Sequence, residues 1–379
     1  MAAATGRRDI RYVVLRRADR DQPVVAPPTA VNLRSHPDAR GGARSYRNDV
    51  TPQDPSETLL ALSFANVAAR ALHVVAEAGV ADALINQPRS SDDLAAETGL
   101  DSDSLARLLR LLEEHGVFRR DHSGCWTHTE ASRLLRSDHS RSMRSFSRMA
   151  GTPLCWESLT HLDHAARTGQ PGIKQLDPGG TFSYLAAHPD QREIFQAAMT
   201  SKSHADIAAA LAAHDFSQYA TICDVGGGRG HLLHAILQAH ERVRGVLFDL
   251  PEVAAGVQPH ERFDTVGGDF FIDKLPKADA YVLMDVIHDW DDKAATEILS
   301  AVHDAGQPQN ATILVIESIM PEGPEPHWSK TLDIVMLTVT GGRERTLNDH
   351  ATLFAAAGIE LVALTPTATS FSIVQARIG

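Results

Sequence analysis

The spacing of hydrophobic residues divides the chain into two parts with different periodicities. Between about residues 57 and 213, apolar side chains recur every three or four positions, which is typical of amphipathic helices. From about residue 214, short apolar runs alternate with helical stretches. Strands are predicted at 221–225, 244–248, 264–266, 280–287, 312–317, 359–364 and 371–376, and helices at 230–240, 291–305 and 347–357. This alternation predicts a parallel sheet with helices on both faces, and the close spacing of the last two strands predicts an antiparallel hairpin at its edge.

Within the helical part, one segment has the pattern of a winged helix. Ser91 favours the start of a helix that ends at Gly99, and Asp101 or Ser102 favours the start of a second helix that stops at Gly116. The other elements predicted here are a hairpin of strands 117–119 and 125–127, and helices at 57–78, 80–85, 140–168 and 190–213. Two helices followed by a hairpin make a winged helix.

The winged helix leaves two functions open. A helix that reads a DNA groove is usually basic, whereas this second helix mixes Arg107 and Arg110 with Glu113 and Glu114. The whole chain carries a formal charge of −12, which argues against nucleic acid or an anionic membrane surface as the main partner. Dimerisation is the favoured interpretation, and a ligand-responsive DNA-binding regulator is the alternative.

Length and composition favour two domains behind a leader. The chain has 379 residues, and its 43% hydrophobic content permits a sizeable core. Residues 1–54 are rich in Arg, Pro, Asp and Gly and are predicted to be mostly disordered, with one strand-like run at 12–15. We predict a helical dimerisation and substrate-lining region at 55–213 and a catalytic domain at 214–379.

The cysteines and the apolar runs of the sequence indicate the cellular compartment of the protein. Cys125, Cys155 and Cys223 are widely separated, so neither a disulfide framework nor a metal-binding spacing emerges. No apolar run is expected to reach the ~18 residues that a membrane span requires. The sequence therefore predicts a soluble, cytoplasmic protein with no metal site and no membrane or nucleic-acid partner.

The most informative motif is a glycine-rich turn between the first strand and the first helix of the second part. Residues 224–230 read Asp-Val-Gly-Gly-Gly-Arg-Gly. The glycines remove side chains from the turn, so main-chain N–H groups can come close to a ligand. Their spacing differs from the G-x-G-x-x-G fingerprint of dinucleotide-binding folds. NAD binding and purely structural glycines remain the alternatives.

Acids near the ends of three strands indicate which ligand to expect. Asp224 precedes the glycine turn, where it would repel a pyrophosphate but suits an ammonium group. Asp249 ends the next strand and can accept hydrogen bonds from both ribose hydroxyls. Asp269 and Phe270 end the third, and they offer an acceptor and a flat apolar face for an adenine. These side chains share the crevice at the carboxyl ends of the strands, and together they describe S-adenosylmethionine better than NAD.

His288 is the candidate catalytic base. It ends the predicted strand at 280–287, beside the glycine turn, and its neutral imidazole can accept a proton near pH 7. The alternative is a role at the start of the next helix. Glu317 ends the fifth strand, and Glu344 lies among arginines, with which it could instead form a surface ion pair. A base with two carboxylates suits methyl transfer to a hydroxyl, because one carboxylate can fix the imidazole tautomer and both can stabilise the imidazolium.

In order and spacing, these motifs resemble those of the plant caffeate-type and bacterial small-molecule S-adenosylmethionine-dependent O-methyltransferases. The similarity runs from about residue 56 to the C-terminus. It rests on five stretches: 224–230, Asp-Leu-Pro at 249–251, Gly-Asp-Phe-Phe at 268–271, His-Asp-Trp at 288–290, and Gly-Gly-Arg-Glu-Arg-Thr at 341–346. The resemblance implies a Rossmann-like methyltransferase domain with an N-terminal winged-helix dimerisation domain. It also implies a homodimer in which the partner contributes to the acceptor pocket.

The resemblance assigns roles to individual residues. The cofactor contacts are assigned to Ser203, Asp224, Gly226, Gly228, Asp249, Leu250, Asp269 and Phe270. The base is His288, flanked by Glu317 and Glu344, and the acceptor side is assigned to Phe195, Met199 and Asp289. Many members carry a basic residue three or four positions before the base, near the adenine. This chain departs from them, with Met284 and Asp285 at those positions.

The acceptor is expected to be an aromatic small molecule of bacterial secondary metabolism, methylated on a phenolic hydroxyl. Trp156 and Met336 are further candidates for lining a flat apolar pocket, although any helical core contains such residues. Some bacterial members of the resembling family carry out hydroxylation or decarboxylation, which is the alternative activity on this fold.

Overall fold

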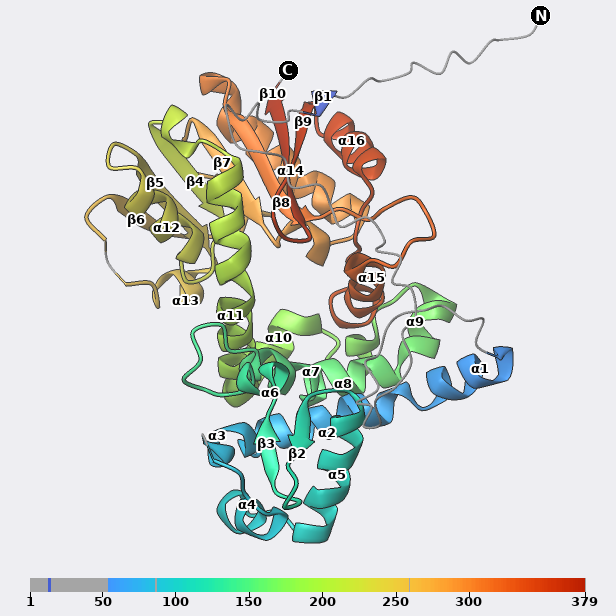
Figure 1. Cartoon of the computed structure of the whole chain (residues 1–379). Helices are drawn as coiled ribbons and strands as arrows, with labels where there is room; N and C mark the ends of the chain where they lie inside the picture. The colour runs from blue at the N-terminus through green and yellow to red at the C-terminus, as the bar shows by residue number, and fades with distance from the viewer. Residues whose placement is uncertain (1–12, 15–53, 86, 259, 379) are drawn as a thin grey trace, which may run out of the picture. The chain divides into compact units, whose positions relative to one another are not determined.

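The structure is a computed structural model that describes residues 13–14, 54–85, 87–258 and 260–378 (Figure 1). Nearly all of the predicted leader, residues 1–54, lies outside the described residues. Within its strand-like run, β1 (Val13–Val14) pairs in parallel with β9 (Ile359–Pro366). The chain divides into two compact units, Arg16–Ala69 and a second made of Met1–Leu15 and Arg70–Gly379.

The second half of the chain forms the predicted sheet. In the described residues its strand order is β1-β9-β10-β8-β7-β4-β5-β6. The other strands are β4 (Thr221–Val225), β5 (Arg244–Asp249), β6 (Phe263–Gly267), β7 (Ala280–Met284), β8 (Thr312–Ser318) and β10 (Phe371–Ile378). Strands β4 to β8 run parallel, whereas β10 is antiparallel to both β8 and β9. The predicted parallel sheet and its antiparallel hairpin are confirmed.

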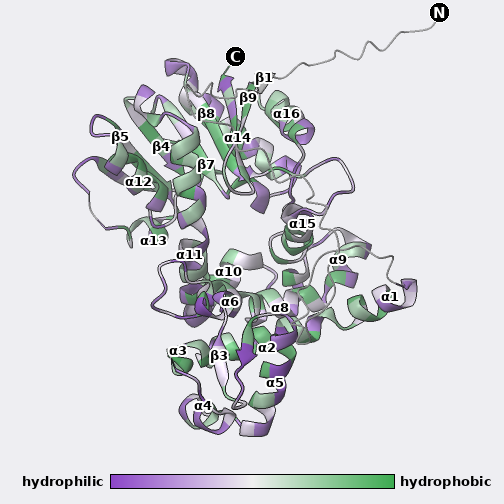
Figure 2. Ribbon diagram, in the orientation of Figure 1, coloured by the Kyte–Doolittle hydropathy of each residue, from purple (hydrophilic) through white to green (hydrophobic). Residues whose placement is uncertain are grey.

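Alternate residues of the central strands face two separate hydrophobic clusters. Tyr281 and Ile313 belong to the cluster that includes α14 (Asp292–Gly306) and α16 (Leu347–Ala356). Their neighbours Val282 and Leu314 belong to the cluster of α11 (Pro189–Ala213) and α12 (His231–Ala239). Helices therefore cover both faces, as predicted. The central strands are accordingly among the most hydrophobic elements in Figure 2.

The fourth predicted strand is too long, and the prediction that His288 ends it is wrong. Strand β7 stops at Met284, and Asp285 turns the chain with a left-handed φ of 54°. His288 lies beyond this turn, on the short 3-10 helix η3 (Ile287–Asp289). Apolar residues resume after Asp285 at Val286 and Ile287, and so the hydrophobic pattern alone does not reveal where the chain leaves the sheet.

The predicted winged helix is present in the first half. Ser90 and Asp101 cap its two helices, and Gly99 ends the first with a left-handed φ of 71°. Its elements are α4 (Ser91–Thr98), α5 (Ser102–Glu114), β2 (Phe118–Arg120) and β3 (Trp126–His128). Their apolar residues, including Leu105, Leu109 and Trp126, form one hydrophobic cluster together with residues of α2 (Ala65–Glu77) and α3 (Val80–Leu84).

Besides α2 and α3, the remaining helices include α6 (Glu130–Arg133), α7 (Arg144–Ala150), α8 (Pro153–Thr160), α9 (Leu162–Thr168), η1 (Gly172–Gln175), α10 (Gly180–Ala187), η2 (Phe216–Gln218), α13 (Pro251–Ala254), η4 (Gln307–Gln309) and α15 (Trp328–Val339). Helices α2, α3 and α7 to α9 lie in the segments predicted to be helical at 57–78, 80–85 and 140–168. Helix α15 was not predicted. Its sequence is rich in Thr, Ile and Val, whose branched side chains lower helix propensity.

The unit Arg16–Ala69 is described from Asp54 onward. Asp54 is the N-cap of helix α1 (Pro55–Ser63), and its side chain accepts a hydrogen bond from the Ser56 N–H. None of the residues of this helix is buried. Leu59 and Leu62 are 68% and 70% exposed. By length and composition alone, the stretch Pro55–Glu77 is apolar enough to cross a membrane, so the expectation that no run reaches this length is wrong.

Candidate active site

The glycine turn after β4 is folded tightly against the neighbouring strand end. Gly226, Gly228 and Gly230 all have left-handed φ values, of 70°, 56° and 76°. A Cβ at Gly226 would lie 2.9 Å from a methyl carbon of Val286, so the turn and the loop that carries His288 are in direct contact. At Gly228, by contrast, an added Cβ would meet no atom within 4 Å, so the turn is open at that position.

Asp249, the last residue of β5, is hydrogen bonded to this turn. Its Oδ2 accepts a bond from the Gly228 N–H at 2.8 Å, and its Oδ1 accepts one from the Leu250 N–H at 2.7 Å. Burial raises the pKa of Asp249, although the two N–H donors oppose that effect. The structure thus brings together four of the residues assigned to the cofactor: Gly226, Gly228, Asp249 and Leu250.

Asp224 is a buried carboxylate with an unused oxygen. Its side chain lies within β4, and Oδ2 has no hydrogen-bond partner among the described residues. Burial, followed by the nearby charge of Asp249, raises the pKa of Asp224 to about 7. A buried carboxylate of this kind is stabilised by a cationic ligand. The ammonium group of S-adenosylmethionine has the required charge, so the residues present fit this cofactor.

The other assigned cofactor residues lie on two further elements. Asp269 follows β6 by two residues, and its Oδ1 accepts a bond from the Phe271 N–H at 2.9 Å. Phe270 contacts Trp290 edge-on, with 5.8 Å between ring centroids. Ser203 lies on α11, where its hydroxyl donates to the Thr200 carbonyl at 3.2 Å.

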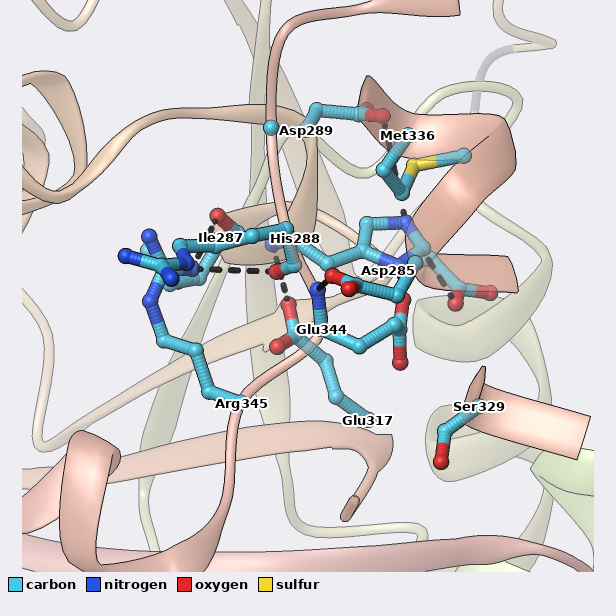
Figure 3. Close-up of polar contacts among 12 residues, drawn as sticks. Asp285, Ile287, His288, Asp289, Glu317, Ser329, Met336, Glu344 and Arg345 are labelled. Atoms are coloured by element: carbon cyan, nitrogen blue, oxygen red, sulfur yellow. Dashed lines mark hydrogen bonds and ion pairs between the residues drawn. The ribbon is translucent and has the colours of Figure 1, made fainter. Parts of the chain in front are cut away.

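The imidazole of His288 is buried between two sets of carboxylates (Figure 3). Nδ1 lies 2.7 Å from Oε1 of Glu344, which fixes the ring orientation. Nε2 makes no hydrogen bond within the described part of the chain, and it lies 3.7 Å from Oδ1 of Asp285 and 3.9 Å from Oδ1 of Asp289. Of the two ring nitrogens, Nε2 is therefore the one left without a hydrogen-bond partner among the residues that the structure describes.

The charges around the ring change its protonation. Burial alone would lower the pKa of His288, but the Glu344 hydrogen bond and the charges of Asp289, Asp285 and Glu317 raise it to about 10. In the ligand-free site the ring is therefore an imidazolium at neutral pH. The sequence-based expectation of a neutral ring does not hold for this state.

Glu317 holds the loop rather than the ring. Its Oε1 accepts main-chain bonds from the N–H groups of Val286 at 3.2 Å and His288 at 3.1 Å. Its Oε2 lies 4.0 Å from Nε2 of His350, a fully buried histidine of α16. Burial raises the pKa of Glu317 to about 7. Of the two predicted flanking acids, only Glu344 is hydrogen bonded to the imidazole.

Arg345 binds the main-chain carbonyls of the same loop; we call this contact the loop clamp. Its guanidinium is buried and donates to the carbonyls of Ile287 at 2.9 Å and Trp290 at 2.8 Å. It also donates to Asp292 Oδ1 at 2.9 Å. Together with Glu317, this arginine satisfies main-chain groups on both sides of His288 and so holds the loop in place.

Lys202 and Asp285 form an ion pair that sequence reasoning missed. Both carboxylate oxygens of Asp285 lie 3.0 Å from Nζ of Lys202, which projects from α11. The lysine also lies over the ring of Phe371, 5.0 Å from its centroid. Asp285 was noticeable in the sequence only as a departure from the resembling family, and nothing in the local pattern indicated its partner 83 residues away.

The predicted acceptor residues occupy several places. Asp289 lies beside Nε2 of His288, and Met336 is buried on α15 and drawn in the same close-up (Figure 3). Phe195 packs against the cluster that contains Leu154 and Tyr184. Met199 is half-buried on α11. The ring of Trp156 contacts His73, at 5.3 Å, and Arg70 rather than the His288 loop.

Trp290 is a further residue that sequence reasoning did not assign. Three phenylalanines surround its ring: Phe182 is stacked at 6.0 Å, and Phe270 and Phe271 approach edge-on at 5.8 and 4.8 Å. This aromatic cluster joins the segment after β6 to the segment after His288. Within the described residues, no group of three or more His, Cys, Asp or Glu residues could hold a metal ion.

A Rossmann-like sheet with a glycine turn, a buried Asp224 with one oxygen unpaired among the described residues, and a carboxylate-held histidine defines an S-adenosylmethionine-binding methyltransferase. Comparison with known proteins agrees. The O-methyltransferase domain matches residues 160–360, and the O-methyltransferase dimerisation domain matches residues 60–138. The chain belongs to the O-methyltransferase family and is an S-adenosylmethionine-dependent O-methyltransferase.

Its relatives match over most of their length. Phenazine O-methyltransferase PhzM of Lysobacter antibioticus is 38% identical over 317 residues, which are 81% of this chain and 92% of the relative. Mitomycin biosynthesis 6-O-methyltransferase of Streptomyces lavendulae is 34% identical over 301 residues, 77% of this chain and 86% of the relative.

Solved structures show the same fold. The crystal structure of LaPhzM has a TM-score of 0.80 at 36% identity and covers 86% of this chain and 100% of its own. Human N-acetylserotonin methyltransferase in complex with S-adenosylmethionine has a TM-score of 0.79 at 26% identity and covers 87% and 99%.

Proposed function

We propose that this enzyme methylates a hydroxyl, most simply a phenolic one, of an aromatic small molecule of bacterial secondary metabolism, with His288 as the general base. The observation that carries the proposal is the free Nε2 of His288, held by the Glu344 bond in a loop that touches the glycine turn. Relatives are named for a phenazine, for mitomycin biosynthesis and for 3-amino-4-hydroxybenzoate, so aromatic acceptors are frequent among them.

Each residue of the site would have its own role in binding or in proton transfer. Asp224, Asp249 and the glycine turn would hold S-adenosylmethionine, which supplies an electrophilic methyl group. Nε2 of His288 would take the proton of the acceptor hydroxyl, so that its oxygen becomes the nucleophile. Glu344 would stabilise the resulting imidazolium, while Glu317 acts as a positioning residue through the main chain. General-base assistance typically contributes about 10²–10⁴-fold.

The base must lose its proton before it can act. With a pKa of about 10 in the ligand-free site, the imidazole is charged at neutral pH. A cationic ligand beside these carboxylates offsets their charges and lowers the imidazole pKa. Cofactor binding is therefore expected to prepare the base as well as supply the methyl group.

We further propose a homodimer located in the cytoplasm. The dimerisation match at residues 60–138 overlaps exposed apolar residues of α1, of α2 and of the junction between them, including Leu62, Val67 and Phe64 respectively. A second subunit would cover this surface and explain its hydrophobicity without a membrane. The three cysteines are free, as expected in a reducing compartment.

Product mass tests the proposed reaction. Purified enzyme with S-adenosylmethionine and a panel of hydroxylated aromatics should give a product heavier by one methylene equivalent. Its methyl group should be on oxygen, as NMR of the product can show. A product that gains one oxygen, or loses carbon dioxide, would instead support hydroxylation or decarboxylation on this fold.

A further inference from the structure

The site around Nε2 of His288 has an unusual charge arrangement. Asp285 and Asp289 each place one carboxylate oxygen within 4 Å of this nitrogen, at 3.7 and 3.9 Å, and neither oxygen is hydrogen bonded to it. The imidazole side chain is only 8% exposed, whereas the two aspartates are 19% and 25% exposed. An acceptor atom bound at Nε2 therefore enters a space already bordered by two carboxylates.

Asp285 is fixed in this place at a conformational cost. It is one of three non-glycine residues with a left-handed φ in the described chain, and such residues are retained where a site requires them. Lys202 binds both of its oxygens at 3.0 Å, and the ammonium also lies against Phe371. The lysine is thus occupied, while Oδ1 of Asp285 keeps a lone pair for a second donor.

Building on the function proposed above, we propose that Asp285, locked by Lys202, is a specificity-determining residue that recognises a hydrogen-bond donor on the ring carbon next to the methylated hydroxyl. The matching acceptors are aromatics with a vicinal hydroxyl or amino group. While one oxygen binds Nε2 of His288, the neighbouring donor reaches Oδ1 of Asp285. A carboxylate at the same ring position would instead face two acids, and the site would reject it.

Three naphthalene probes that differ at one ring position test this inference. They are 2,3-dihydroxynaphthalene, 2-naphthol and 3-hydroxy-2-naphthoate, titrated by calorimetry into the enzyme saturated with S-adenosylhomocysteine. The wild type should bind the diol about tenfold or more tightly than 2-naphthol, because a hydrogen bond to a charged group is lost with the second hydroxyl. The naphthoate should bind more weakly than 2-naphthol.

The Asp285→Asn variant should change the order of preference. Asparagine tolerates a left-handed φ, so the backbone is retained. The advantage of the diol should fall to within about threefold, as expected when a neutral amide replaces the charged acceptor. The freed ammonium of Lys202 should make the naphthoate bind better than in the wild type. Adding Lys202→Met to that variant should abolish this gain.

Two more variants keep the test decisive. Lys202→Met alone should weaken naphthoate binding further relative to 2-naphthol. This variant can be measured even if Asp285→Asn does not fold. Glu360→Gln, which breaks the exposed Glu360–Arg377 pair, is the matched control and should leave all three affinities unchanged. Equal binding of diol and naphthol by the wild type, no binding of the diol, or an unchanged ratio in Asp285→Asn would overturn the inference. Selective binding without methyl transfer to any phenol would instead overturn the proposed function.

Discussion

His288 and Glu344 are 56 residues apart in sequence, yet Nδ1 and Oε1 lie 2.7 Å from each other in a buried site. The glutamate comes from the segment after α15, and the histidine from the segment after β7. This single contact orients the ring so that Nε2 is left without a hydrogen bond to the described residues, and it raises the pKa of the imidazole.

The Glu344→Gln variant should separate these two effects. An amide can still accept the Nδ1–H bond, but it no longer stabilises the charged ring. We expect the pKa of His288, followed by NMR of the imidazole in the ligand-free enzyme, to fall from about 10 towards its ordinary value. Turnover should fall about 10²-fold while S-adenosylhomocysteine binds normally. A titration that does not move would contradict the role given to Glu344.

Asp224 should make cofactor binding depend on pH. Its pKa is about 7 in the ligand-free protein, so below that pH a proton must leave before the carboxylate can pair with an ammonium. The Kd for S-adenosylhomocysteine should therefore rise about tenfold per pH unit below 7. In the Asp224→Asn control, binding should be weaker but nearly independent of pH over this range. Parallel pH profiles for both proteins would exclude this pairing.

The stability of the ligand-free enzyme should fall as the pH rises. The folded pKa values of Asp224, Asp289 and Glu317, about 7, 6 and 7, all exceed the usual carboxylate value. The stability that each protonated carboxyl group contributes is therefore complete below about pH 4. It is lost as the pH rises through the pKa of that group in the folded protein. His288 follows the same sign, with its loss spread from about pH 6.5 to 10.

Thermal unfolding across pH 5–9 checks this trend. Glu317→Gln keeps an oxygen for the two N–H groups but removes the buried charge, so its Tm should fall less between pH 5 and 8 than that of the wild type. If the two proteins lose Tm equally, ionisation of the buried Glu317 carboxylate does not destabilise the fold.

Arg345 and Arg343 offer a matched pair for testing the loop clamp. Both contact Asp292, but Arg345 is buried and also binds two loop carbonyls, whereas the Arg343 side chain is 56% exposed. Arg345→Lys should cost about 2–3 kcal/mol in the free energy of unfolding, because a lysine cannot reproduce the planar fork. Arg343→Lys should cost little. Urea unfolding measures both, and equal losses would argue against the clamp.

The glycine turn can be tested with a control elsewhere in the chain. Gly226 and Gly124 both have left-handed φ values, but only at Gly226 would a Cβ meet another atom within 4 Å. Gly226→Ala should therefore weaken S-adenosylhomocysteine binding more than tenfold in calorimetry, because the turn must shift away from Val286. Gly124→Ala should lose about 1 kcal/mol of stability and no affinity.

The fold was largely predictable because its signals are local. Strand β4 and the glycine turn can be predicted from consecutive residues. Asp249 can be placed at a strand end because it directly follows the next apolar run. The loop around His288 was not predictable in the same way. Glu344 is hydrogen bonded to the imidazole of His288, whereas Glu317 is hydrogen bonded to the main chain of the same loop. This difference depends on where the chain leaves the sheet, at Asp285. The partnership of Asp285 with Lys202 joins two elements that share no sequence pattern.

The rate of methyl transfer by the His288→Ala variant tests the central claim most directly. The measurement uses an acceptor that the wild type methylates, with S-adenosylhomocysteine affinity recorded for both proteins. We predict unchanged cofactor affinity within about threefold and a turnover lower by about 10²–10⁴-fold. Turnover within twofold of the wild type, with the cofactor bound normally, would contradict the assignment of His288 as the base.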